Sequence, residues 1–418
     1  MLDKPKPFEI PKSLVWEAYK QVKANQGGAG VDQETLEGFD HKLSKNLYKI
    51  WNRLSSGSYF PPAVRGVEIP KKQGGTRLLG VPTVADRIAQ MTIKLMFEPL
   101  VEPHFLDDSY GYRPNKSALD AIGITRKRCW NYDWLIEFDI KGLFDNIDHE
   151  LLMKAVRHHT DNKCILLYIG RWIKAPLELS DGTTQERTFG TPQGGVISPI
   201  LSNLYLHYVF DAWMTRTHPE SLWCRYADDG ICHCRTKEQA EALLAELKLR
   251  FIACKLEIHP EKTKIVYCKD GNRKEVLADN TSFVFLGYEF RARRAENSKN
   301  RQTFTAFLPA ISPKAEKSIL EKVRALNIRN RSDLALSQIA KWINPLLRGW
   351  INYYGKYTRS ALTNVLQRIN ATLVKWSMRK YENIRYKKIR AAMHMKEYAD
   401  RHSYLFIHWK IGVTSAFI

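Results

Sequence analysis

Residues 222–234 read LWCRYADDGICHC, and this stretch decides how the fold is interpreted. Apolar and polar residues alternate on both sides of the Ala-Asp-Asp-Gly centre, a pattern that predicts two strands joined by a tight turn. Asp228 and Asp229 then lie at the tip of a hairpin. Adjacent carboxylates make a poor core, but they are the oxygen ligands that hard divalent cations prefer. The alternative is an ordinary turn, because Asp tolerates left-handed backbone and caps its own turn.

A third aspartate follows an apolar run well upstream. Residues 134–139 read WLIEFD, which predicts a buried strand that ends at Asp139. Two strands that each deliver carboxylates at one end are what two-metal nucleotidyl transfer requires, since the metals bridge the attacking oxygen and the triphosphate. Together the two segments favour a nucleotidyltransferase site over an ordinary turn.

Two glycine-containing segments could complete a nucleotide pocket. Strands are predicted at 64–69 and 76–81 around the sequence KKQGG, and Lys71 and Arg77 flank this tip. Two cations on a hairpin could cradle a triphosphate, the alternative being an exposed basic turn. The sequence GTPQGG at 190–195 runs into a predicted helix, and such a loop brings backbone close to a ligand. Gln193 could therefore line the nucleotide pocket.

Charge is distributed unevenly along the 418 residues. From residue 291 onward lie 26 of the 65 Lys and Arg residues but 7 of the 44 Asp and Glu residues, so the last 128 residues carry +19 and the first 290 carry +2. Aromatic residues are interleaved with these cations, a mixture that suits phosphate contacts and base stacking. The pattern predicts a nearly neutral catalytic body followed by a basic module that binds nucleic acid.

The predicted fold class is α+β. Helical periodicity dominates the start, strands and helices alternate in the middle, residues 283–288 form a further strand, and helices follow at about 314–325, 333–354 and 361–380. We expect three parts: residues 1–85, residues 86–290 as the catalytic domain, and residues 291–418 as a basic helical domain. No apolar run is long enough to span a bilayer, and seven scattered cysteines suggest reduced thiols in a cytosol.

These blocks, in this order, resemble the reverse transcriptases encoded by bacterial group II introns, the intron maturases. The resemblance runs from about residue 25 to residue 409. It rests on GVD at 30–32, YADD at 226–229, INPLLRGWINYY at 343–354 and FIHW at 406–409. It implies a right-hand polymerase, with N-terminal extension and fingers, a palm built on an antiparallel sheet, and an α-helical thumb or maturase domain.

The resemblance also implies roles for individual residues. Asp139 and Asp228 would bind two Mg²⁺ ions, Asp229 would assist, and the Ile140 carbonyl would complete the metal shell; Mn²⁺ is an alternative metal. Lys262 is the candidate proton donor to the departing pyrophosphate, with Lys264 as a second candidate and a solvated lysine as the alternative.

Four residues would bind the incoming dNTP. Lys71 and Arg77 match the residues that hold the triphosphate, and Gln193 matches the residue near the sugar. Phe144 lies five positions after Asp139, where an aromatic ring would exclude a 2′-hydroxyl and so select dNTPs. Nucleic-acid contacts are assigned to five further residues: Arg113, Arg348, Trp350, Tyr353 and Tyr354.

We therefore expect an RNA-directed DNA polymerase that adds dNTPs to a DNA or RNA primer on an RNA template, binds group II intron RNA, and assists splicing and retrohoming. The alternatives are a free-standing relative in DNA repair or phage defence, and a splicing maturase without polymerase activity. No cysteine follows Cys268, so we expect the C-terminal endonuclease of some family members to be missing. We expect a bacterial cytoplasmic protein without a membrane partner. A homodimer is an open alternative to a monomer.

Overall fold

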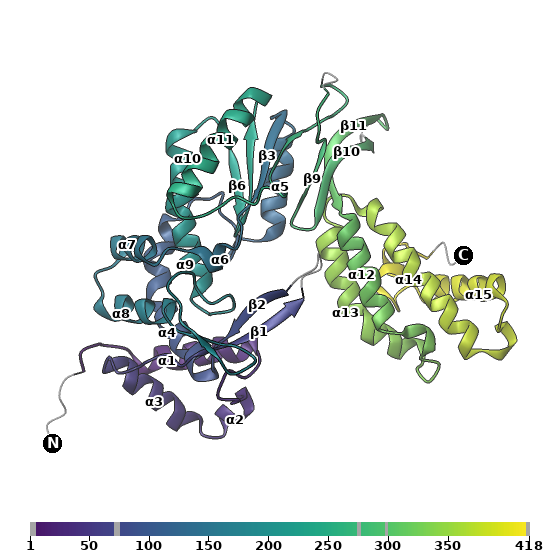
Figure 1. Ribbon diagram of the computed structural model, residues 1–418. Helices are drawn as coiled ribbons and strands as arrows, with labels where there is room; N and C mark the ends of the chain where they lie inside the picture. The colour runs from purple at the N-terminus through teal and green to yellow at the C-terminus, as the bar shows by residue number, and fades with distance from the viewer. Residues whose placement is uncertain (1–5, 71–75, 274–276, 297–299, 415–418) are drawn as a thin grey trace. The chain divides into compact units, whose positions relative to one another are not determined.

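The computed structural model describes residues 6–70, 76–273, 277–296 and 300–414. The chain divides into two compact units (Figure 1). The first unit comprises Met1–Ala121 and Ile136–Lys264, and the second comprises Ile122–Leu135 and Ile265–Ile418. The presence of mixed and antiparallel sheets together with helices confirms the predicted α+β class. None of the helices in these described ranges is long and apolar enough to cross a bilayer.

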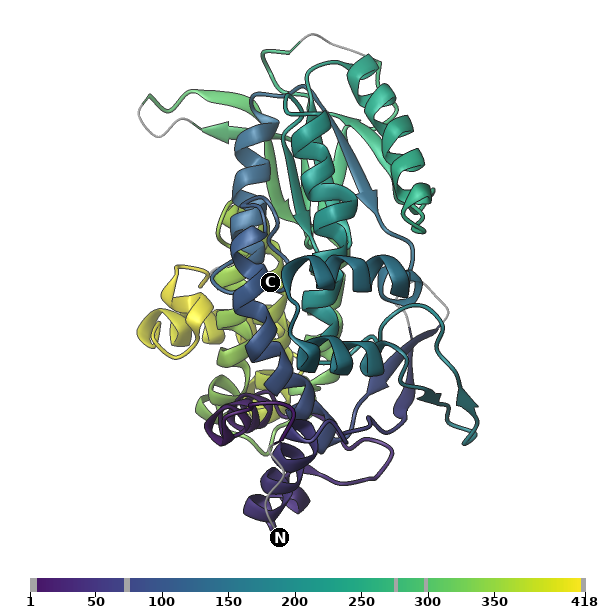
Figure 2. The same cartoon turned by 90° about the vertical axis from the view of Figure 1, so that its left-hand side faces the viewer.

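The first unit begins with three helices and a strand hairpin, in agreement with the helical periodicity at the start of the chain and with the strands predicted at 64–69 and 76–81. They are α1 (Lys12–Asn25), α2 (Leu36–Asp40), α3 (Leu43–Ser55), β1 (Val64–Pro70) and β2 (Thr76–Val81). The apolar face of α1 packs on α4 (Val84–Val101). Strands β1 and β2 pair antiparallel, from Arg65 opposite Val81 to Pro70 opposite Thr76. The short strands β4 (Leu177–Glu178) and β5 (Thr184–Gln185) extend this sheet beside β1 (Figure 2).

A second sheet carries the aspartates, and its strand order is β6-β7-β3-β8. Its strands are β3 (Trp134–Asp139), β6 (Trp223–Tyr226), β7 (Asp229–Cys234) and β8 (Lys264–Tyr267). Phe138 of β3 packs against Phe210 and Phe251, with ring centroids 5.1 and 5.8 Å away. The Phe138 ring also lies on the β7 backbone, where a Cβ at Gly230 would come within 2.1 Å of it. Glycine after the paired aspartates therefore lets the core close under the hairpin.

The first unit contains further helices, of which α11 lies beside this sheet (Figure 1). They are α6 (Leu143–Asn146), α7 (His149–His159), α8 (Lys163–Ile173), α9 (Ser198–Leu206), a π-helical turn (His207–Asp211), α10 (Ala212–Thr217) and α11 (Lys237–Ala253). Side-chain caps begin several of them: Asp148 caps α7, Asn162 caps α8 and Thr236 caps α11. The π-helical turn and α11 bring Phe210 and Phe251 onto the sheet.

The second unit contains a three-stranded sheet in the order β11-β10-β9. Its strands are β9 (Ser282–Phe285), β10 (Tyr288–Glu296) and β11 (Thr303–Ile311). The single strand predicted at 283–288 is therefore wrong, because the chain turns at Leu286 and Gly287, which both have positive φ. Strands β10 and β11 were missed, since their many Arg and Thr residues weaken the apolar alternation that identifies strands.

Helices form the rest of the second unit. They are α5 (Ala118–Cys129), which begins in the first unit, α12 (Pro313–Ala325), α13 (Leu336–Tyr354), α14 (Arg359–Lys380), α15 (Lys388–Arg401) and α16 (Ile407–Lys410). Helices α12 to α15 bury one continuous apolar core, which Trp376 and Trp409 help to fill. The three helices predicted after residue 313 are confirmed as α12, α13 and α14.

Candidate active site

The two adjacent aspartates lie where β6 turns into β7: Asp228 is in the turn and Asp229 is the first residue of β7. Tyr226 pairs with Asp229, which leaves Ala227 and Asp228 as the two-residue loop. Ala227 has a φ of 56°, a left-handed conformation that is unfavourable for a residue with a Cβ. Gly111 packs against this turn, and a Cβ there would come 2.4 Å from the Ala227 nitrogen. A turn held in an unfavourable conformation by its surroundings is typical of functional sites.

The third aspartate, Asp139, ends the neighbouring strand at the same edge of the sheet. The amide of Ile140, the next residue, donates to the Asp228 carbonyl at 3.2 Å, and the Asp139 carbonyl accepts from the His259 amide at 2.8 Å. These bonds tie the end of β3 to the carboxylate turn on one side and to residue 259 on the other. The three predicted aspartates are therefore brought together although Asp139 and Asp228 are far apart in sequence.

Negative charge accumulates at this edge of the sheet. Burial, together with the charges of Asp228, Asp139 and Glu137, raises the pKa of Asp229 to about 7. Burial likewise raises the pKa of Asp228, and the Asp139 charge acts in the same direction. A carboxyl group that loses water and faces other carboxylates is stabilised by any cation that enters. The electrostatics of the site therefore favour a bound cation.

Two lysine side chains place positive charge beside these carboxylates. Lys262 forms an ion pair with Asp139, and Lys264 forms one with Glu137 at 3.3 Å. The charges of Lys262 and Arg77 oppose the increase in the pKa of Asp228. Both lysines that the sequence offered as proton donors thus lie at the carboxylates, with Lys262 on Asp139 itself.

The donor set suits magnesium or manganese. Carboxylate and carbonyl oxygens are hard ligands, and Mg²⁺ in nucleotide enzymes is bound by one or two carboxylates, with substrate phosphates and waters completing its shell. Within the described residues no group of three or more His, Cys, Asp or Glu side chains could hold a metal by itself.

A fully buried ion pair lies directly beneath the carboxylate turn. The Arg225 guanidinium donates to both Asp211 carboxylate oxygens at 2.7 and 2.6 Å, and to the Ala227 carbonyl at 3.2 Å. It also donates to the side-chain oxygen Oδ1 of Asn203 at 3.2 Å, and the side-chain Nδ2 of Asn203 donates to the Gly111 carbonyl at 2.6 Å. One arginine thus links the turn, the π-helical turn and the loop that packs on the carboxylate turn. The sequence analysis missed this arrangement, although Arg225 directly precedes the YADD motif.

The glycine-rich loop is fixed from below by a second buried network. Asp86 accepts hydrogen bonds from Trp172 and Gln90, at 2.8 and 2.9 Å. The side-chain oxygen Oε1 of Gln90 accepts in turn from the backbone amide of Val196, directly after the loop, at 2.8 Å. The Gln193 carbonyl accepts from the Gly80 amide of β2 at 2.8 Å, so the loop is also joined to the hairpin.

A hollow of about 430 Å³ lies where the loop meets the hairpin, and Gln193, Gly80 and Asp145 are among its lining residues. We call it the nucleotide hollow. Phe144 lies nearby on α6, where it is buried, and its ring meets that of Tyr112 edge-on at 6.3 Å. Burial raises the pKa of Tyr112, and the Asp228 charge raises it further, so this ring lies near the carboxylates. Tyr112 was not predicted as a site residue; the aromatic loop at 110–114 was the available signal.

The predicted triphosphate cations lie on the hairpin of the first sheet. Arg77 is exposed on β2 opposite Ile69. Its charge lowers the pKa of both Asp228 and Tyr112, which indicates that it faces the carboxylates. Lys71 lies outside the described residues.

The five predicted nucleic-acid contacts differ in exposure. The Arg113 side chain is 6% exposed, and its guanidinium donates to Glu102 and to the carbonyls of Phe105, Leu106 and Ser109. These bonds favour a structural role for Arg113. Tyr353 donates to the Leu286 carbonyl at 2.8 Å, and Trp350 and Tyr354 pack against the helical core. Of the five, Arg348 alone is classed as exposed.

A strongly basic surface, missed by the sequence analysis at the level of single residues, lies elsewhere on the second unit. Two hollows, of about 650 and 370 Å³, share Arg329 and Lys375, and we call them together the basic groove. Its other cations are Arg324, Arg368, Arg379 and Arg385, all exposed, and Tyr386 beside them is 89% exposed. None of the described residues that line it is acidic.

Two segments of the chain match known protein families. Residues 69–290 match the family described as reverse transcriptase (RNA-dependent DNA polymerase), and residues 316–394 match the group II intron maturase-specific domain. The first match covers more than half of the chain and contains Asp139, Asp228 and Asp229. The chain belongs to the group II intron reverse transcriptases.

This reverse transcriptase is similar to proteins from bacteria and yeast. Protein YkfC of Escherichia coli (strain K12) is 32% identical over 318 residues, which are 66% of this chain and 79% of that protein. The group II intron-encoded protein LtrA of Lactococcus lactis subsp. cremoris is 28% identical over 432 residues, covering 83% of this chain and 69% of LtrA. A putative COX1/OXI3 intron 1 protein of Saccharomyces cerevisiae is 32% identical over 199 residues, 47% and 23% of the two chains.

The predicted family and enzyme class are thereby confirmed. This group II intron reverse transcriptase consists of a reverse transcriptase domain followed by a helical maturase domain. Those two domains imply a nucleic-acid template and intron RNA as partners, and reverse transcriptases in general use divalent metal.

Proposed function

We propose that this reverse transcriptase extends the 3′ end of a DNA or RNA primer with dNTPs on an RNA template, and that Asp139, Asp228 and Asp229 perform the chemistry. One observation carries the proposal: the strained turn with Asp228 and Asp229 is bonded to the strand end at Asp139, and burial raises the pKa of Asp229 to about 7. Carboxylates that repel one another at the end of a sheet are stabilised by metal cations.

The metal ligands in this proposal are the carboxylates of Asp139, Asp228 and Asp229 and the carbonyl oxygen of Ile140. Two Mg²⁺ ions, or Mn²⁺ in their place, supply charge neutralisation at the phosphates and activation of the primer hydroxyl when bound. Lys262 is ion-paired with Asp139 and would be displaced from that carboxylate by a cation. Its ammonium could then donate a proton to the departing pyrophosphate oxygen.

The dNTP would lie between the glycine-rich loop and the β1–β2 hairpin. Arg77, together with Lys71, would bind the triphosphate, because guanidinium and ammonium groups bind phosphate oxygens strongly. Gln193 would lie near the sugar at the nucleotide hollow. Phe144 would exclude a 2′-hydroxyl, and its contact with Tyr112 would keep the ring in place.

In the proposed right-hand arrangement, residues 1–85 form the N-terminal extension and fingers, residues 86–290 the rest of the fingers and the palm, and residues 291–418 the thumb and maturase domain. The basic groove of the second unit, with Arg348, would bind phosphates of intron RNA, because exposed cations without neighbouring acids attract polyanions. The enzyme would thereby assist splicing and retrohoming in a bacterial cytoplasm; a homodimer is compatible with this proposal.

A splicing maturase without polymerase activity is the second candidate, and a free-standing enzyme of DNA repair or phage defence is the third. The basic groove favours RNA binding in each case. The second candidate does not account for the buried Arg225–Asp211 pair beneath the aspartates, since RNA binding alone does not require a fixed carboxylate turn.

Primer extension tests the proposal. The substrate is poly(rA) annealed to oligo(dT), with dTTP and Mg²⁺, and wild type is compared with Asp228→Ala. Wild type should extend the primer, and the variant should lose about a thousandfold or more in rate while it keeps its RNA affinity, because metal-ion stabilisation contributes several kcal/mol. Variant activity within about tenfold of wild type would contradict the assignment of the aspartates. RNA binding without extension by either protein would favour the second candidate.

A further inference from the structure

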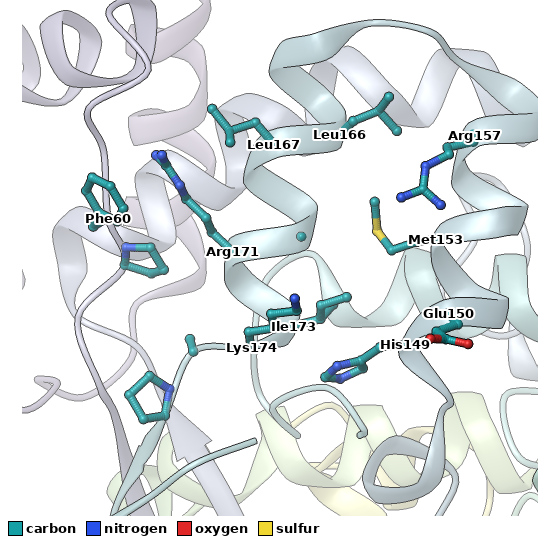
Figure 3. A pocket seen from close by; sticks show the side chains of 14 residues that line it. Phe60, His149, Glu150, Met153, Arg157, Leu166, Leu167, Arg171, Ile173 and Lys174 are labelled. Atoms are coloured by element: carbon teal, nitrogen blue, oxygen red, sulfur yellow. The ribbon is translucent and has the colours of Figure 1, made fainter. Parts of the chain in front are cut away.

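A large hollow of the first unit lies away from the aspartates, between α7, α8 and the segment before β1. It has a volume of about 830 Å³, and we call it the α7–α8 groove. Figure 3 shows Phe60 on one wall, Arg157 on the opposite wall, and Met153 and Leu166 between them. Nothing in the polymerase chemistry proposed above uses these residues.

Phe60 is an unusual feature of this groove, because a large apolar side chain is 70% exposed and yet held in place. The Arg171 guanidinium lies over its ring, 3.9 Å from the centroid. The same guanidinium donates to the Gly57 and Tyr59 carbonyls at 2.8 and 2.6 Å, so its position is fixed by the backbone next to Phe60. One face of the ring is thus supported by a cation, and the ring is prepared to stack on a further planar group.

The charge of the groove is positive. Arg157 and Lys174 are exposed on its walls, and Glu150 is the one acidic side chain among the described residues that line it. The first 290 residues together carry only +2, so this is a local concentration of cations. Cations beside a supported aromatic ring match the phosphates and bases of unpaired nucleic acid.

The groove adjoins the nucleotide hollow. Pro176 lines the groove and Leu177 lines the nucleotide hollow. His149 of the groove makes a 2.7 Å hydrogen bond to the Gly190 carbonyl, and Gly190 packs on the Phe144 and Asp145 backbone. The template must be unpaired where it reaches the incoming nucleotide. The groove lies close to that position, because Pro176 and Leu177, which line the groove and the nucleotide hollow respectively, are consecutive in the chain.

We propose that the α7–α8 groove binds the unpaired template RNA ahead of the catalytic site, with one base stacked on Phe60 and the adjoining phosphates on Lys174 and Arg157. The proposal rests on the polymerase function proposed above, which determines where the template must run. It assigns a nucleic-acid site to a unit whose overall charge gives no indication of one.

Binding measurements on the full chain test this inference. RNA template–DNA primer duplexes carry unpaired template 5′ ends of about 2 or about 20 nucleotides, because single-strand sites cover on the order of 4–16 nucleotides. Wild type should bind the long overhang more tightly. Phe60→Ala should lower the ratio of the two affinities about tenfold, and Phe60→Trp should restore it, since a larger ring stacks at least as well.

The cations are tested by salt dependence. In the double variant Arg157→Gln, Lys174→Gln, the slope of log affinity against log salt on the long overhang should fall by about 1.4, since each single-strand phosphate contact contributes about 0.7. Two residues on α11 serve as matched controls outside the groove. Leu249→Ala removes a side chain that is 69% exposed, and Lys248→Gln removes one exposed charge. Both should behave as wild type.

Three outcomes would overturn the inference. They are unchanged affinity ratios in the Phe60 and cation variants, an equal loss of affinity for both overhangs, and competition by polyglutamate that matches competition by RNA. Failure of the polymerase function is distinguished by wild type itself, which would then bind both duplexes but extend neither. Thermal unfolding of each variant reveals whether a loss of binding reflects a loss of fold.

Discussion

The aspartate site of the first unit and the basic groove of the second unit both depend on charge, but they use it in opposite ways. At the aspartate site the charged groups are partly buried, raise one another's pKa values, and are held by hydrogen bonds at defined distances. In the basic groove all of the cations are exposed. The interaction energy of a buried charge depends on its exact position, because solvent screens it little. The effect of exposed charges depends mainly on their number, because solvent and salt screen each of them.

The largest expected effect is at the buried pair beneath the turn. Asp211→Asn leaves the Arg225 guanidinium buried without its counter-charge, which should cost about 3–5 kcal/mol in the free energy of unfolding. The displaced turn should lower the primer-extension rate about a hundredfold, as small misplacements of catalytic groups do. Denaturant unfolding and primer extension measure the two effects.

A milder variant tests whether the position of the carboxylate turn affects activity when the fold is kept. Asn203→Ala removes the bonds to Arg225 and to the Gly111 carbonyl but leaves the ion pair. The variant should still fold and should bind RNA as tightly as wild type, but its primer-extension rate should be lower. If extension by Asn203→Ala equals that of wild type, the network supports the fold alone and the contrast with the basic groove weakens.

The next effect concerns the shape of the nucleotide site. Phe144→Ala removes the ring packed against Tyr112, so a 2′-hydroxyl should be admitted. The preference for dNTPs over rNTPs in kcat/KM should fall about tenfold to a hundredfold, as expected when a steric contact of this size is lost. Single-nucleotide incorporation with dTTP and UTP measures it, and Tyr112→Phe, which keeps the ring, is the control. An unchanged preference would make Phe144 a core residue only.

The basic groove should respond in a graded way. Arg379→Gln and Arg385→Gln should each reduce the salt slope of RNA binding by about one and weaken affinity for all sequences alike. The two effects should add, because exposed charges act independently. RNA titrations at several salt concentrations measure this. The template–primer duplex with the short overhang should still be extended by both variants at saturating concentration. If one of the two substitutions caused nearly all of the loss of RNA affinity, that residue would belong to a defined binding pocket.

The smallest expected effect is on pH dependence. Burial lowers the pKa of His408 to about 3, and its ring bonds the Asn370 side chain at 2.7 Å. The folded protein then binds fewer protons than the unfolded chain between pH 6.5 and pH 3, so stability is present above pH 6.5 and is lost as pH falls. The second unit's Tm should fall by about 2–4 °C for each 1 kcal/mol lost.

Replacement of the histidine provides the control for this measurement. His408→Gln should lower Tm at neutral pH and flatten its dependence on pH, because the titrating group is gone. His159 of the first unit, with a pKa lowered to about 4 by burial and by His104, His158 and His207, lies in a more solvated place and should contribute less. A His408→Gln variant with the wild-type pH slope would assign the acid sensitivity to other groups.

Local patterns in the chain were enough to predict much of the candidate active site. Alternation around YADD predicted the β6–β7 hairpin, and the apolar run before Asp139 predicted β3, because strands and turns are specified by neighbouring residues. The glycine-rich loop before α9 was likewise predicted. These features lie within short windows of sequence, and the structure contains all of them.

Contacts between distant residues could not be read in this way. Arg113 and Arg348 were both assigned to nucleic acid, yet one is bound by Glu102 and three carbonyls and the other is exposed. The same residue type serves either role, and the difference arises only from which groups the fold places around it.

The sequence alone predicted the family, singled out the three aspartates as candidates and determined the concentration of positive charge after residue 290, because motifs and composition are properties of the chain. Tertiary structure decided that Arg225 and Asp211 hold the aspartate turn, that Phe60 is supported by Arg171, and which exposed cations gather in one groove. Burial and hydrogen-bond partners depend on segments far apart in sequence, so these properties exist only once the chain has folded.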